Sequence, residues 1–391
     1  MYKQHNGKTN FKYSLKNIPT PSKTNYHLKL IDKIESVIKR MRWKASFFLS
    51  EPKENLEKPE TFGFKTKLTP SSLPELASFE NELIDLCMSI KFNKQPNHFQ
   101  SQLHKDKNTI KNSTKVLVFA DKTNNIYSMT KTDHNKLLKD NVTKTYKKAP
   151  ENLEKSINFE AEHIANSYNL SERVECIATN PAFVTLKDHK DNFLSKPTCR
   201  LINPAKSELG KISKSILDKI NKSIKNKLMC NQWKNSKDVI NWFQNLNHKN
   251  SSFIQFDIKE FNPSISPNVL SQAVRFASTF ANITDIDLRT INHCRKSLLF
   301  FNNESWKKKN TDSCSDVTMG SFDGAEICEL VGLFILNELS KFINKGDIGL
   351  YRDDGLMVTT LSSGRLIEKL RQKIIKTFKD IGFDIEITTN L

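Results

Sequence analysis

The chain has 391 residues, and its 61 Lys and Arg against 43 Asp and Glu give a net charge of +18, which indicates a polyanionic partner such as nucleic acid. No apolar run approaches the roughly 20 residues of a membrane-spanning helix, and the N-terminus lacks the apolar core of a secretory signal. We therefore expect neither a membrane protein nor a secreted one. Seven scattered cysteines, none in a C-x-x-C pair, argue against zinc and favour a reducing intracellular compartment, either nucleus or cytoplasm.

Helical patterns dominate the first part of the chain. Residues 1–60 are basic and polar, which predicts a partly disordered extension with one amphipathic helix around Leu30–Met41. Residues 61–110 are expected to hold the end of a linker and a helical region. Helical spacing recurs over Leu76–Phe92, with an apolar face made by Leu76, Phe79, Leu83, Leu86 and Cys87. The run Lys115–Ala120 then predicts a buried strand, continued after a turn by Asn125–Tyr127.

The first acidic motif follows a short apolar run. Phe253–Ile258 predicts a buried strand with Asp257 near its end, where an unpaired carboxylate is costly unless a metal or cation is close. Ser266 followed by Pro267 predicts the start of a helix, with an N-cap and proline at its first position. The apolar face of that helix is expected to comprise Val269, Leu270, Ala273, Val274 and Ala277.

The second acidic motif lies between two apolar runs, in the sequence I-G-L-Y-R-D-D-G-L-M-V from Ile348 to Val358. Asp-Gly between such runs favours a β-hairpin, which would carry Asp353 and Asp354 at its tip. Mutual repulsion of the two carboxylates is tolerated where divalent cations bind. Hard oxygen ligands suit Mg²⁺, with Mn²⁺ as an alternative. Each motif alone is also compatible with a solvated turn or strand end, but their joint order favours catalysis.

The remaining elements complete a recognisable order. A long apolar helix is predicted over Ala325–Phe342, with Asp323 and Glu326 as a capping box at its start. After the hairpin we expect a helix that ends at Gly382 and a strand over Phe383–Ile387. Strand, helix, helix, hairpin, helix and strand in this order match an α+β, ferredoxin-like antiparallel sheet covered by helices. In that fold the three carboxylates meet on one sheet face.

The two acidic motifs resemble those of reverse transcriptases, especially retroelement-encoded ones. D-I-K-E-F-N-P-S-I, from Asp257, is similar to the first palm motif, and Y-R-D-D, ending at Asp354, is similar to Y-x-D-D. The resemblance implies a right-hand polymerase with fingers over 111–252 and a palm over 253–391. It implies that Asp257, Asp353, Asp354 and the main-chain carbonyl of Ile258 bind two divalent ions, and that the substrates are dNTPs, an RNA template and a DNA or RNA primer.

The same resemblance extends into the expected fingers. V-T-L-K-D-H-K leads to S-K-P-T-C-R-L-I-N-P, and basic residues here hold the triphosphate in the family, which implies this role for Arg200, Lys187 and Lys190. His189 is either a general acid or a solvated loop histidine. The stretch W-K-K-K from Trp306 suits stacking and phosphate contacts on a single strand, or else it is a basic loop with one anchoring tryptophan.

Three departures from the family pattern qualify these expectations. Of the family motif Q-G-x-P-x-S-P, only the glycine has a clear match in this sequence, at Gly320. Where the family has an aromatic residue that screens out the ribose 2′-hydroxyl, this chain has Asn262, so either Phe261 serves by a register shift, or discrimination is weak, or the copy is decaying. The sequence ends after the last palm strand, so a thumb and other element-encoded domains are expected to be missing: either the chain is a fragment, or a partner supplies the missing part. The expected function is RNA-directed DNA polymerase; the alternatives are an RNA-dependent RNA polymerase and an inactive nucleic-acid-binding relict.

Overall fold

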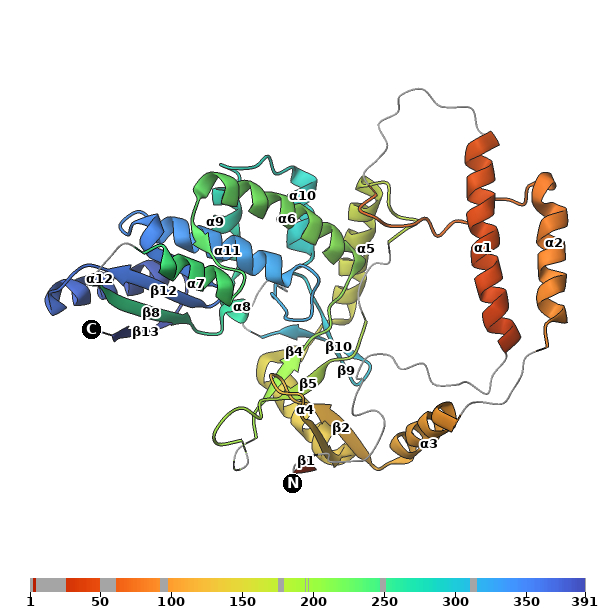
Figure 1. The fold of residues 1–391 in the computed structure, drawn as a ribbon, viewed down its shortest axis with the longest axis horizontal. Helices are drawn as coiled ribbons and strands as arrows, with labels where there is room; N and C mark the ends of the chain where they lie inside the picture. The colour runs from red at the N-terminus through yellow and green to blue at the C-terminus, as the bar shows by residue number, and fades with distance from the viewer. Residues whose placement is uncertain are drawn as a thin grey trace. The chain divides into compact units, whose positions relative to one another are not determined.

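The computed structural model describes residues 3–4, 26–49, 61–91, 98–174, 179–193, 195, 197–246, 251–309 and 315–390. The chain divides into two compact units (Figure 1), which comprise Met1–Lys139 with Val184–Arg200, and Asp140–Phe183 with Leu201–Leu391. None of the helices in the described ranges is long and apolar enough to cross a membrane.

The first unit begins with helices. These are α1 (Tyr26–Leu49), α2 (Pro74–Ser89) and α3 (His98–Asn112), and α1 contains the predicted amphipathic helix. The guanidinium of Arg42 on α1 donates to both carboxylate oxygens of Glu80 on α2, at 2.7 and 2.5 Å. This pair turns Glu80 inward, so the predicted apolar face of α2 is wrong for Phe79 and Leu86, which are exposed, although Cys87 is buried.

Short strands complete the first unit. The elements are β1 (Lys3–Gln4), β2 (Lys115–Phe119) and β3 (Ile126–Thr130), with α4 (Lys131–Thr145), β5 (Phe183–Leu186) and β6 (Cys199–Ile202), which lie partly in the second unit. The strands β1, β3 and β2 form an antiparallel sheet in that order, and β5 pairs with β6. The predicted strand at Lys115 and its continuation after a turn are confirmed as the hairpin β2–β3, with Phe119 opposite Ile126.

The second unit contains a five-stranded sheet with the order β13-β8-β12-β11-β7. Its strands are β7 (Asn231–Gln232), β8 (Ser252–Ile258), β11 (Ile348–Tyr351), β12 (Asp354–Thr359) and β13 (Ile385–Asn390). All neighbours are antiparallel except β7 and β11. Without β7, the order is that of the predicted ferredoxin-like fold, which is confirmed. A smaller sheet, ordered β4-β10-β9, contains β4 (Tyr146–Lys148), β9 (Leu299–Phe301) and β10 (Glu304–Lys308).

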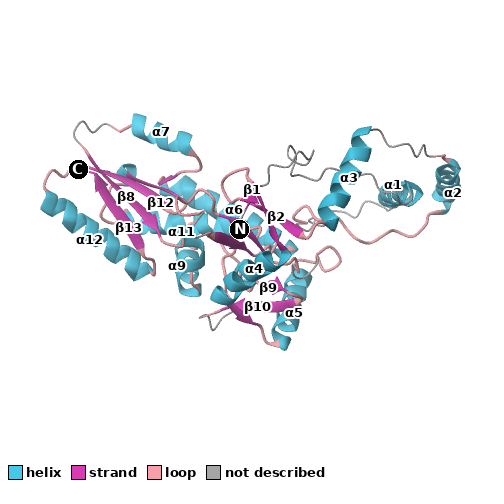
Figure 2. Cartoon of the chain, turned by 90° about the horizontal axis from the view of Figure 1, so that it is seen from below, coloured by secondary structure: helices cyan, strands magenta, loops and turns pink. Residues whose placement is uncertain are grey.

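Helices cover both faces of the five-stranded sheet (Figure 2). The helices of this unit are α5 (Glu151–Ser167), α6 (Glu208–Leu228), α7 (Ser236–Gln244), α8 (Phe261–Ser264), α9 (Pro267–Ala277), α10 (Asp285–His293), α11 (Gly324–Leu339) and α12 (Gly364–Ile381), with a 3₁₀ turn at Lys345–Asp347. On one face Phe256 packs against Phe378 of α12, with ring centroids 5.3 Å apart. On the other, Trp242 of α7 joins Trp233 and Val358 in an apolar cluster.

Local signals at the helix ends are mostly confirmed. Ser266 accepts a hydrogen bond from the Val269 amide at 3.2 Å, and the five predicted apolar residues of α9 are all buried. Gly382 ends α12 with φ of +113°, in the left-handed region that favours glycine. The capping box at α11 is wrong, because Asp323 makes no cap hydrogen bond. Its carboxylate is instead buried and paired with Arg295.

Candidate active site

Three carboxylates lie side by side across adjacent strands of the five-stranded sheet. Asp257 on β8 is directly opposite Asp354 on β12 and directly opposite Glu386 on β13. Directly opposite residues of paired strands project to the same face. Asp353 precedes Asp354, and its main-chain carbonyl accepts a hydrogen bond from the Ile258 amide at 3.0 Å. The fold thus brings the two sequence motifs to one edge of the sheet.

The turn between β11 and β12 differs from the predicted one. Tyr351 pairs with Asp354, so the loop residues are Arg352 and Asp353, and Arg352 has φ of +57° where glycine is more common. Gly355 lies inside β12, not in the turn. A Cβ at Gly355 would stand 2.0 Å from Cζ of Phe256, so this glycine admits the aromatic ring on the neighbouring strand.

The exposure of Asp257 also corrects the sequence interpretation. Strand β8 alternates, with Ile254, Phe256 and Ile258 buried and Asp257 exposed, whereas a fully buried strand was expected. Helix α7 covers the distal part of this face, and the carboxylates occupy the remaining part. Partial desolvation and then the negative charges of Asp353, Asp354 and Glu386 raise the pKa of Asp257. The ammonium of Lys259 is 2.9 Å from Glu386 and partly offsets this charge.

The oxygen ligands of this edge suit a hard cation in their chemistry. Among the described residues, no group of three His, Cys, Asp or Glu side chains is close enough to hold a metal ion. Mg²⁺, however, is usually bound by one or two carboxylates and completes its shell with water and substrate phosphates. The adjacent pair Asp257 and Asp354 meets that smaller requirement. After desolvation, the negative charges of Asp353, Asp354 and Glu386 contribute to the raised pKa of Asp257, and a divalent cation would offset these charges.

Phe261 and Asn262, the two residues considered for contact with the ribose, differ in exposure. Phe261 is buried, and its ring packs against Phe383 with centroids 5.5 Å apart. Asn262 is partly exposed on the same short helix, α8. The register-shift interpretation therefore has no support, because Phe261 faces the core.

Gly320 is a position of close packing. A Cβ there would stand 1.9 Å from the main-chain carbonyl oxygen of Asn203. The turn after Gly320 leads directly into α11, which packs against β11, the strand before Asp353. Burial raises the pKa of the Cys328 thiol to about 12, and the charge of Asp353 contributes to that shift. Cys328 is four residues beyond Gly324, or about 6 Å along the helix axis.

The predicted triphosphate-binding residues Arg200, Lys187 and Lys190 belong to the first unit. Arg200 donates to Asp121 at 3.0 Å, and a third of its side chain is exposed. Lys187 is half-buried and Lys190 is exposed. Within the described residues, neither lysine side chain has a hydrogen-bond or ion-pair partner. The same loop includes Asp188, which accepts hydrogen bonds from three side chains: Thr123, Asn125 and Tyr127.

Those hydrogen bonds hold the pKa of Asp188 below its usual value, although burial acts to raise it. His189, next to this well-anchored carboxylate, is exposed, as expected for a solvated loop histidine.

The stacking interpretation of W-K-K-K is wrong. Trp306 is buried in β10, and its indole donates to the carbonyl of Phe301 at 3.3 Å. Lys308 is 3.3 Å from the carboxylate of Asp316, and Lys309 donates to a main-chain carbonyl. The burial of Trp306 was missed because the strand β10, in which Trp306 is buried, was not predicted from the sequence.

Two features of the site were missed from the sequence. Glu386 lies at an exposed position of the predicted alternating strand, but only strand pairing places it beside Asp257. The Arg295–Asp323 pair joins residues from two separate elements, with side chains 2% and 0% exposed. Ser213 of α6 also donates to Asp323, at 2.5 Å. No motif marks either pairing, since both depend on tertiary packing.

Comparisons with known proteins give a fold but not a family. No protein-family model matches the chain, and no curated protein sequence does. Telomerase from Candida albicans, solved with a TWJ fragment of telomeric RNA, is similar in structure, with a TM-score of 0.52 at 11% identity. The match covers 83% of this chain and 56% of that one, so this chain spans little more than half of its length.

Two further solved structures are similar at lower scores. C-terminally truncated telomerase from Candida tropicalis has a TM-score of 0.49 at 12% identity, covering 94% of this chain and 87% of that one. The RNA-dependent RNA polymerase of a human picobirnavirus has a TM-score of 0.41 at 10% identity, covering 89% and 72%. The sheet order and the Candida albicans match alone give the architecture, which is the α+β fold of a right-hand polymerase with palm and fingers.

Proposed function

We propose that this chain is a template-directed nucleotidyltransferase of the reverse-transcriptase type, from a retroelement, that adds nucleotides to a primer 3′ end on an RNA template. The observation that carries the proposal is the row of Asp257 and Asp354 on adjacent strands, with Asp353 in the turn beside them. Two unrelated sequence motifs supply these carboxylates, and the fold brings them together. The fold similarity to solved polymerases supports the same reading.

The roles of the residues follow from their chemistry. Asp257, Asp353 and Asp354, with the carbonyl of Ile258, would hold two Mg²⁺ or Mn²⁺ ions. When bound, such ions activate an attacking hydroxyl and stabilise a leaving phosphate. Arg200 would bind the triphosphate of the incoming nucleotide with the N–H groups that Asp121 does not occupy. Lys187 and Lys190 are the further cations proposed for this role.

A second candidate, RNA-dependent RNA polymerase, is favoured by one observation. Phe261 faces the core and only Asn262 is partly exposed, so no aromatic ring at this place is available to exclude a ribose 2′-hydroxyl. We therefore expect ribonucleotides to be accepted along with deoxynucleotides. Substitution of Asn262 by Tyr would then shift incorporation toward dNTPs.

Primer extension on an RNA template with Mg²⁺ tests the proposal. Wild type is compared with Asp353→Asn/Asp354→Asn, and dNTPs are compared with NTPs in parallel reactions. Extension that disappears in the double variant is expected. If wild type binds the template–primer but extends it with neither nucleotide, the polymerase proposal is contradicted, and a non-catalytic nucleic-acid-binding relict is favoured instead.

A further inference from the structure

The turn before α11 presents an aromatic ring between two lysines. The ring of Phe322 is half-buried, with the ammonium of Lys211 at 5.2 Å from its centroid and that of Lys206 at 5.9 Å. Both lysine side chains are exposed, and Met319 at the start of the turn is 51% exposed. We name Lys206, Lys211, Met319 and Phe322 the Phe322 platform.

The platform is held rigidly from below. Gly320 is pressed against the main chain of Asn203, and Asp323 directly after Phe322 is paired with the buried Arg295. Helix α6 also approaches closely, since a Cβ on Gly210 would be 3.4 Å from Cβ of Phe322. The ring is therefore fixed in place by groups that are themselves fully packed. A rigid aromatic loses little conformational freedom when a ligand stacks on it.

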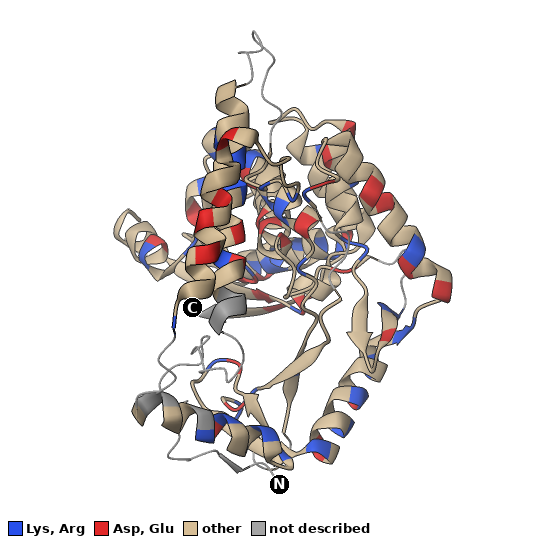
Figure 3. Cartoon of the chain, turned by 90° about the vertical axis from the view of Figure 1, so that its right-hand side faces the viewer, with Lys and Arg blue, Asp and Glu red and all other residues tan. Residues whose placement is uncertain are grey.

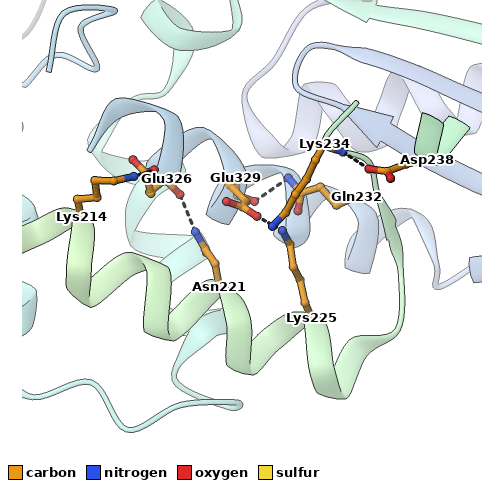
Figure 4. A network of polar contacts seen from close by, with 8 residues as sticks. All are labelled: Lys214, Asn221, Lys225, Gln232, Lys234, Asp238, Glu326 and Glu329. Atoms are coloured by element: carbon orange, nitrogen blue, oxygen red, sulfur yellow. Dashed lines mark hydrogen bonds and ion pairs between the residues drawn. The ribbon is translucent and has the colours of Figure 1, made fainter. Parts of the chain in front are cut away.

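Three lysines of α6 show two kinds of contact. Figure 4 shows Lys214 and Lys225 paired with Glu326 and Glu329 of α11, which neutralise them at the helix–helix contact. Lys211, on the same helix, has its ammonium 5.2 Å from the centroid of the Phe322 ring. More generally, Lys and Arg are interspersed with Asp and Glu along the helices (Figure 3), so the net charge alone does not locate a binding surface. The Phe322 platform combines positive charge with an aromatic face.

This combination matches one ligand class. Single-stranded nucleic acid is bound by aromatic rings that stack on bases and by cations that contact the phosphates on either side. The platform directly precedes α11, and α11 packs against β11, the strand that leads into the turn with Asp353. We propose that Phe322 stacks with a base of single-stranded nucleic acid, and that Lys206 and Lys211 contact its flanking phosphates. This inference rests on the proposed polymerase function.

The test measures binding of the full chain to a fluorescent oligouridylate by fluorescence anisotropy, in the absence of metal and nucleotide. Phe322→Ala is expected to weaken binding about 5- to 150-fold, the range of one lost stacking contact. Phe322→Trp should bind like wild type. Phe322→Leu, which keeps apolar packing but offers no ring, should be weakened like Phe322→Ala. Phe159→Ala, at a 64% exposed phenylalanine on α5, is the matched control and should have no effect.

The lysines are tested through the salt dependence of binding. Lys206→Gln and Lys211→Gln should each reduce the slope of log affinity against log salt by about 0.7, as expected for one phosphate contact on a single strand. Lys369→Gln, an exposed lysine of α12, serves as control. The platform is refuted if Phe322→Leu binds as tightly as wild type or if neither slope changes. Wild type that binds no nucleic acid overturns the proposed function too, whereas binding without extension contradicts only that function.

Discussion

The buried pair Arg295–Asp323 gives the sharpest stability prediction. Its side chains are 2% and 0% exposed, and Nη1 of Arg295 and Oδ1 of Asp323 have no hydrogen-bond partner among the described residues. Arg295→Met leaves the Asp323 carboxylate buried beside Ser213 with no countercharge. Removing one partner of such a pair typically costs about 3–5 kcal/mol in the free energy of unfolding.

Replacing both partners should recover much of that loss. In Arg295→Met/Asp323→Leu no unpaired charge remains, and apolar replacements of buried pairs are often neutral or stabilising. Urea unfolding, followed by tryptophan fluorescence and circular dichroism, measures the free energy for wild type, both single variants and the double variant. The difference between the double variant and the sum of the singles gives the coupling energy.

A small effect would refute this reasoning. If Arg295→Met costs less than about 1 kcal/mol, the pair is either hydrated or able to relax, and the full burial penalty does not apply. A double variant no more stable than the singles would show that Ser213 and the turn at Gly320 depend on Asp323 itself. The Phe322 platform would then be expected to lose nucleic-acid binding in every Asp323 variant.

Three other predictions concern Asp257 and two closely packed glycines, Gly355 in the sheet and Gly320 in the turn before α11. The raised pKa of Asp257 means that stability falls as pH rises from the unfolded value near 4 through the folded one. Asp257→Asn should therefore be more stable than wild type at neutral pH and match it below about pH 4 in thermal melts; a pH-independent difference would contradict this. Gly355→Ala should lower the free energy of unfolding by about 1–3 kcal/mol, because its methyl would stand 2.0 Å from the Phe256 ring. Gly364→Ala, with open space around the new methyl, is the control and should leave the free energy of unfolding unchanged. Gly320→Ala should lower the melting temperature at least as much as Gly355→Ala does. Its methyl would stand 1.9 Å from the main-chain oxygen of Asn203, which cannot rotate away as a side chain can. An unchanged melting temperature would show that the turn can shift.

Local features of the second unit followed from the sequence because their causes are local. Ser266 and Pro267 begin α9, and Gly382 ends α12, since capping and left-handed backbone depend on neighbouring residues only. Apolar spacing predicted β8, α9, α11, the hairpin β11–β12, α12 and β13, and their order predicted the sheet. The same order brought Asp257 and the second acidic motif to one sheet edge.

What failed depended on partners far away in the chain. Asp323 has the position of a cap, yet the opposite charge of Arg295 binds it in the core. Trp306 reads as an exposed aromatic among lysines, yet its strand buries it. The acidic row gains Glu386 only through the pairing of β13 with β8. The sequence by itself determined the elements, their order and the acidic motifs, because propensity, capping and periodicity act over a few residues. Only the tertiary structure decided which face each side chain occupies and which charges meet, because burial and strand register are set by packing across the whole unit.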